Sequence, residues 1–223
     1  GLSINRRGNP YAPWFAVVDA VAGGERVGTI VNIAVHPVAI GRDIDVVSSD
    51  WVGVFRHVLE AAAGGLTVVL PSALGDVNPP PHPTEGVEGS LEHAQLVGQA
   101  LAAAVADALD STAPLGDGSE VVRSEVIEVP ASGLLAQLAG VGDRMEVELV
   151  EWRVGSATLV AVPGEAFHAM GLAIEASHDG PVLLAGLAPS WQGYLPEPFG
   201  DGYEETVSFG ADAVAGIRAA LVR

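Results

Sequence analysis

The sequence contains no cysteine and no lysine, and the two absences exclude several kinds of site. Without cysteine, disulfide bonds and thiolate metal sites are excluded, so any metal must be bound by histidine, carboxylate, tyrosine or water. Arginine supplies all ten basic residues against 28 acidic ones, which gives a formal net charge of −18. Because such a surface repels phosphate backbones, we expect no nucleic-acid partner.

Long apolar runs are also lacking. No run reaches the ~18–20 residues of a membrane span, so we expect no transmembrane segment. The chain has neither an initiator methionine nor an apolar targeting stretch after Gly1, which indicates a processed product or a piece of a longer protein. Its 223 residues, 49% of them hydrophobic and 17% charged, are typical of a globular chain. We expect a single domain over residues 1–223.

Hydrophobic periodicity predicts strands and helices that largely alternate along the chain. Strands are expected at 14–22, 25–36, 66–70, 120–129 and 180–187, with a hairpin at 145–162. Helices are expected at 48–65, 90–111, about 165–176 and 209–222, the first of them capped by Ser49 or Asp50. This order indicates an α/β fold with a mixed β-sheet covered by helices.

Three of the predicted strands deliver polar groups into loops, where binding residues often collect. They lead to His36, to Ser72 and Asp76, and to Glu165. Each residue also has a structural interpretation. A lone histidine at a strand end is usually a hydrogen-bonding residue, Asp76 suits an Asx-turn, and Glu165 could complement the dipole of the helix expected to begin there. Taken one at a time, these residues do not indicate a function.

Taken together, the segments that contain them resemble one family. "INRR", "VNIAVHPVAI", "VVSSDWVGVF", "VVLPSALGDVNPP", "VAVPGEAFHAMG" and "LLAGLAPSWQGYLPE" followed by "GYEE" occur in that order. They resemble the neutral, nonlysosomal ceramidases and their bacterial ceramidase-like relatives, over most of the chain. The resemblance implies a zinc-dependent amidase that cleaves N-acylsphingosine into sphingosine and a fatty acid.

The resemblance also implies roles for particular residues. His36 and Glu165 match two zinc ligands of the family, Ser72 matches a serine implicated in catalysis, and Arg6 matches an arginine that contacts substrate. The chain departs from the family pattern in two ways. It lacks the H-T-H-S segment that supplies another histidine ligand, which would have to come from an upstream segment or a companion chain.

The second departure concerns the family's tyrosine ligand. Trp191 occupies its place, and indole nitrogen is a donor only, so it cannot bind zinc. Trp191 is instead expected to contact substrate, together with Arg6 and with Tyr194, which lies three residues further on and matches a second tyrosine in the family's substrate pocket. With only His36 and Glu165 as visible ligands, we expect this chain alone to bind zinc weakly.

Two alternatives to a ceramidase-type enzyme stay open. The first is a metallohydrolase that acts on another small amide or ester. The second is a degenerate, non-catalytic family member that serves as a binding or structural subunit, which Trp191 and the absent H-T-H-S segment favour. The resemblance further leads us to expect an extracellular or periplasmic location.

Overall fold

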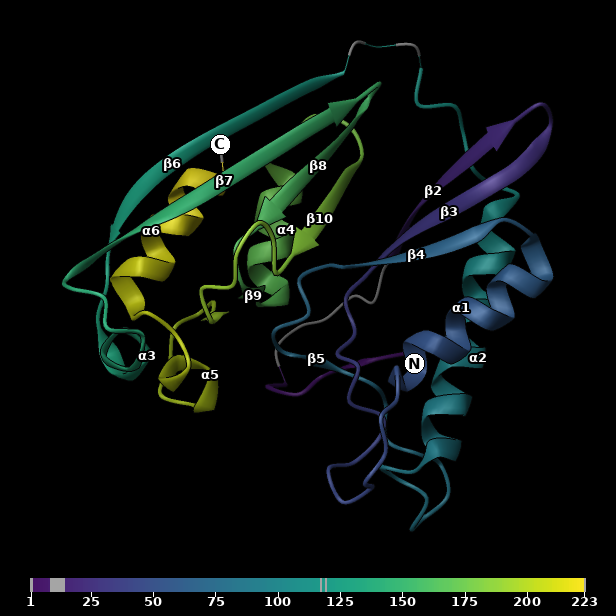
Figure 1. Ribbon diagram of the computed structural model, residues 1–223, viewed down its shortest axis with the longest axis horizontal. Helices are drawn as coiled ribbons and strands as arrows, with labels where there is room; N and C mark the ends of the chain where they lie inside the picture. The colour runs from purple at the N-terminus through teal and green to yellow at the C-terminus, as the bar shows by residue number, and fades with distance from the viewer. Residues whose placement is uncertain (1, 9–14, 117, 119, 223) are drawn as a thin grey trace. The chain divides into compact units, whose positions relative to one another are not determined.

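The computed structural model describes residues 2–8, 15–116, 118 and 120–222 (Figure 1). Residue 14, where the first predicted strand begins, lies outside them. Contacts divide the chain into two compact units: unit 1 comprises residues up to 70 and 77–113, and unit 2 comprises 71–76 and the residues from 114 onward.

Unit 1 is a small sheet packed against two helices. Its elements are β1 (Ile4–Asn5), β2 (Phe15–Ala22), β3 (Glu25–Ile33), α1 (Asp50–Ala63), β4 (Leu66–Pro71, whose last residue belongs to unit 2), β5 (Val77–Asn78) and α2 (Leu91–Leu109). The main sheet has the order β2-β3-β4, with β2 and β3 antiparallel, and β1 pairs with β5 separately. Trp51 and Phe55 of α1, Leu101 of α2 and Val31 of β3 share one core.

Unit 2 is a larger sheet with helices against one face. Its elements are β6 (Val121–Pro130), α3 (Gly133–Ala139), β7 (Arg144–Val154), β8 (Ala157–Val162), β9 (Glu165–Ala166), α4 (His168–Ala176), β10 (Val182–Gly186), β11 (Tyr194–Leu195), α5 (Tyr203–Thr206) and α6 (Ala211–Leu221). The sheet order is β10-β8-β7-β6, with β10 parallel to β8 and the other neighbours antiparallel. Helices α4 and α6 lie against the same face (Figure 1), where Met170, Ile217 and Val160 are completely buried.

The predicted α/β class, with a mixed sheet covered by helices, is confirmed. Several boundaries were wrong. The second strand ends at Ile33 and not at His36, the helix expected from about residue 165 begins at His168, and the short helix α3 was not predicted. The prediction of one domain over 1–223 stays a prediction. Among the described residues, no helix is long and apolar enough to cross a membrane.

Candidate functional site

His36 lies in unit 1, three residues beyond the end of β3. Its backbone N–H donates to the carbonyl oxygen of Val77 at 2.9 Å. Its own carbonyl oxygen accepts the indole N–H of Trp51 at 2.9 Å, and Trp51 is buried in the core of the unit. The backbone of His36 is therefore held through both its N–H and its carbonyl oxygen, by partners in β5 and α1.

Asp50 holds the chain that follows His36 and Pro37. Its carboxylate accepts the backbone N–H groups of Ala39 at 3.1 Å and Ile40 at 2.7 Å. Asp50 has a φ of 55°, in the left-handed region that only a well-supported non-glycine residue adopts. The sequence suggested Asp50 as a helix cap, and its carboxylate does accept the backbone N–H of Trp51 in the first turn of α1 at 2.7 Å, while it also fixes the segment that leads away from His36.

Ser72 lies at the start of the segment 71–76, which belongs to unit 2. The residue is 1% exposed, and its buried hydroxyl oxygen makes no hydrogen bond with any described residue. A Cβ atom at Gly186, the last residue of β10, would lie 2.9 Å from the Ser72 carbonyl oxygen. The close approach of these backbones sets Ser72 beside the end of β10, an edge strand of the sheet, and requires glycine at 186.

Two hydrogen bonds join the segment 71–76 to the residues around Glu165. The Gly75 N–H donates to the Ala166 carbonyl oxygen at 2.8 Å. The Asp76 carboxylate accepts the backbone N–H of His168, the first residue of α4, also at 2.8 Å. Asp76 is 1% exposed, so this charge-assisted bond is shielded from water. Ser72 and Glu165 therefore sit in segments that are fastened to each other inside one unit.

Glu165 follows a tight turn at the end of β8. Pro163 ends that strand, and Gly164 allows a close approach, since a Cβ there would lie only 2.5 Å from the Gly193 carbonyl oxygen. Glu165 then pairs in parallel with Tyr194 of β11. The Trp191 indole N–H donates to Oε1 of Glu165 at 3.0 Å. The carboxylate is thus oriented by an indole and flanked by a tyrosine.

The beginning of α4 contains a buried histidine that sequence reasoning did not single out. His168 is 2% exposed, and burial lowers the pKa of its imidazole, an effect that the nearby Asp76 carboxylate opposes. The helix dipole was expected to act on Glu165, but the carboxylate bound at the helix N-terminus is that of Asp76. The interpretation of Asp76 as only a turn residue was therefore incomplete.

Glu175, near the other end of α4, has its pKa raised to about 7 by burial. The folded protein therefore binds this proton more tightly than the unfolded chain, so stability should fall as pH rises from about 4.5 to 7. We expect Glu175→Gln to stabilise the protein by about 1–2 kcal/mol above pH 7, after allowance for solvent screening. Urea unfolding at pH 4.5 and 7.5 measures the effect.

The matched control for this prediction is Glu146→Gln, which changes an exposed carboxylate on β7 of the same unit. It should leave the pH dependence of unfolding as it is in the unchanged protein. Equal stabilisation by Glu175→Gln at both pH values would contradict the prediction, because an uncharged Glu175 and a glutamine differ little at low pH.

The predicted site residues are divided between the units. Ser72, Glu165, Trp191 and Tyr194 belong to unit 2, whereas His36 belongs to unit 1 together with Arg6, an exposed residue after β1. The structure brings together Glu165, Trp191 and Tyr194 directly, and Ser72 through the bonded segments. Within the described chain, no group of three or more histidine and carboxylate side chains is placed to hold a metal ion.

Comparisons with known proteins give a consistent likeness at the level of fold. No protein-family model matches the chain, and no curated protein matches it in sequence. The structure of neutral ceramidase from Pseudomonas aeruginosa superposes with a TM-score of 0.72 at 16% identity, over 93% of this chain and 45% of that one. A ceramidase complexed with C2 gives a TM-score of 0.75 at 14% identity, over 99% of this chain and 50% of that one.

The chain thus spans about half the length of these ceramidases. At these identities the likeness shows the fold alone. The protein has a ceramidase-like α/β fold.

Proposed function

We propose that the protein to which this chain belongs is an amide hydrolase of ceramidase type, which cleaves N-acylsphingosine into sphingosine and a fatty acid. One observation carries the proposal: the buried Ser72 hydroxyl and the Glu165 carboxylate lie in segments fastened by the Gly75–Ala166 and Asp76–His168 hydrogen bonds. The ceramidase-like fold supports it. Preorganised polar groups of this kind are what catalysis of amide hydrolysis requires.

Each of the two residues has a role in this proposal. The Ser72 hydroxyl forms no hydrogen bond with any described residue. It can therefore donate a hydrogen bond to the oxyanion that develops on the scissile carbonyl group, or attack the carbon atom of that group. The Glu165 carboxylate, whose Oε1 accepts the Trp191 indole N–H, is proposed to bind a cation or to accept a proton. Tyr194, beside Glu165, and Arg6 are proposed to contact the substrate.

Zinc is part of the proposal, with His36 and Glu165 as two of its ligands. A catalytic zinc commonly takes three protein ligands and keeps a position for water, and the metal makes that water more acidic and polarises a carbonyl group. The described residues do not form such a set, and Glu165 already shares one oxygen with Trp191. The proposal therefore requires at least one ligand from outside the described residues, in an upstream segment or a companion chain.

The test is metal content and hydrolysis in the full-length protein. We expect about one zinc ion per molecule by mass spectrometry, lost in both His36→Ala and Glu165→Ala, together with release of fatty acid from ceramide. Ser72→Ala should lose the hydrolysis but keep the zinc. Full zinc content and full activity in both ligand variants would refute the assignment, and hydrolysis of short N-acyl amides alone would exclude ceramide as the substrate.

A non-catalytic role is the second candidate, and the Trp191 bond to Glu165 favours it. An indole N–H that occupies the carboxylate weakens Glu165 as a metal ligand. If the protein is non-catalytic, the full-length form should bind no zinc, and Trp191→Tyr should be needed to create an affinity for it. The expected location outside the cytoplasm stays a prediction.

A further inference from the structure

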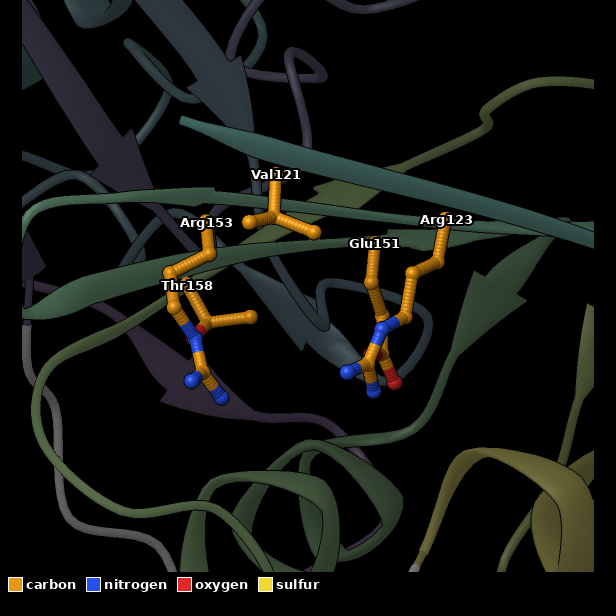
Figure 2. A pocket seen from close by; sticks show the side chains of 5 residues that line it. All are labelled: Val121, Arg123, Glu151, Arg153 and Thr158. Atoms are coloured by element: carbon orange, nitrogen blue, oxygen red, sulfur yellow. The ribbon is translucent and has the colours of Figure 1, made fainter. Parts of the chain in front are cut away.

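A small pocket lies at one end of the four-stranded sheet of unit 2, apart from Ser72 and Glu165 in the chain. It has a volume of about 40 Å³ and is lined by Val121, Arg123, Glu151, Arg153 and Thr158 (Figure 2). The lining residues come from three adjacent strands, where Arg123 pairs in register with Glu151 and Arg153 with Thr158. Figure 2 shows both arginine side chains extending from the sheet in the same direction.

Most other described arginines of this acidic protein have partners, although the exposed Arg42 also has none among the described residues. Arg26, Arg56, Arg144 and Arg218 each form an ion pair with a carboxylate. Arg6 and Arg7 also have interactions. Among the described residues, the side chains of Arg123 and Arg153 form no hydrogen bond or ion pair, although the chain has 28 acidic residues and ten basic ones. Both arginines are exposed, so a dissolved anion can reach their guanidinium groups.

Glu151 does not neutralise the pocket. Its carboxylate lies 3.5 Å from Nε2 of His178, which follows α4. One carboxylate that already has a neighbouring imidazole faces two guanidinium groups, so the lining retains an excess of positive charge. Thr158, which is 3% exposed, adds a polar group to the lining.

We propose that this pocket, built by Arg123, Arg153 and Thr158, binds a small oxyanion of the carboxylate or phosphate class. Guanidinium groups present planar pairs of N–H donors that match the oxygens of such anions, and a hydroxyl adds another donor. The volume of about 40 Å³ fits a small anionic group and excludes a lipid chain.

The test uses the full-length protein and inorganic phosphate as the probe, with chloride adjusted to keep the ionic strength constant. We expect saturable binding of one phosphate by calorimetry, with a dissociation constant on the order of 1 mM, and a rise in melting temperature. Arg123→Gln and Arg153→Gln should each weaken binding about ten-fold, because each loses a charge-assisted pair of bonds. Glu151→Gln should strengthen binding, since it removes the carboxylate from the lining.

Arg144→Gln is the matched control, because Arg144 lies on the same strand as Arg153 and is already paired with Glu128. It should leave phosphate affinity unchanged. Melting curves without phosphate verify that each variant is folded. Acetate in place of phosphate shows which oxyanion is preferred, and binding of either supports the proposal. Equal effects of chloride and phosphate, absence of saturable binding of both anions, or equal weakening by Arg144→Gln would overturn it.

Discussion

Replacing Asp76 with alanine is expected to lower the free energy of unfolding by about 2–3 kcal/mol and to abolish the proposed hydrolysis by the folded protein. The Asp76 carboxylate is buried and accepts the first backbone N–H of α4. Alanine leaves that N–H without its acceptor and releases the segment that carries Ser72 from the residues around Glu165. Chemical denaturation measures the first effect, and turnover well below the melting temperature measures the second.

Two variants separate this role of Asp76 from a general effect of charge. Asp76→Asn keeps an oxygen that can accept the His168 N–H, so it should recover most of the lost stability. Asp179→Ala removes an exposed carboxylate from the same unit and should change little. If Asp76→Ala and Asp179→Ala prove equally stable and equally active, the bond to His168 is without consequence.

Gly75→Ala is expected to have the next largest effect, a loss of about 1–3 kcal/mol of stability, with a larger loss of activity than of folded protein. The reason is steric: a Cβ atom at Gly75 would clash with the Glu165 carbonyl oxygen and lie 2.9 Å from that of Ala166. These atoms belong to the backbone and cannot rotate away, so the segment with Ser72 must shift from the Glu165 turn. Urea unfolding and the kcat of the full-length protein measure the two effects.

Gly142→Ala provides the matched control within the same unit. A Cβ atom at Gly142 would meet no heavy atom of the described residues within 4 Å. Because alanine has less freedom than glycine in the unfolded chain, this variant should be as stable as the original protein or more stable by about 0.4–1 kcal/mol. Equal stability and kcat in the Gly75 and Gly142 variants would show that the steric argument fails.

The features that the sequence predicted correctly are those that depend on local periodicity. The apolar stripe of α2 and the alternation along β6 specify one element each, whatever packs against it. The pairs β1–β5 and β9–β11 could not be predicted this way, because each strand has two residues and forms only against a partner far along the chain. Glu165 was therefore expected at the start of a helix, although it lies in β9.

The candidate site was predictable only in part, for the same reason. The resemblance singled out Ser72 and Glu165, which lie in two segments that hydrogen bonds join to each other. It gave no role to Gly75, which bonds to Ala166, or to Asp76, which bonds to His168. Both partners are distant in the sequence: Asp76 and His168 are 92 positions apart. In the sequence alone, "GD" is fully compatible with an ordinary turn. Only the fold reveals that the Ala166 carbonyl oxygen accepts from Gly75 and that the His168 N–H donates to Asp76.

The division of the chain also constrains how this protein can be cut and recombined. The segment 71–76 belongs to unit 2, although the residues on either side of it along the chain belong to unit 1. No single breakpoint therefore yields two complete modules. A gene fragment that begins at residue 114 encodes most of unit 2 but omits Ser72 and Asp76, so α4 would start without its carboxylate. Domain shuffling at that boundary would separate the serine from the glutamate.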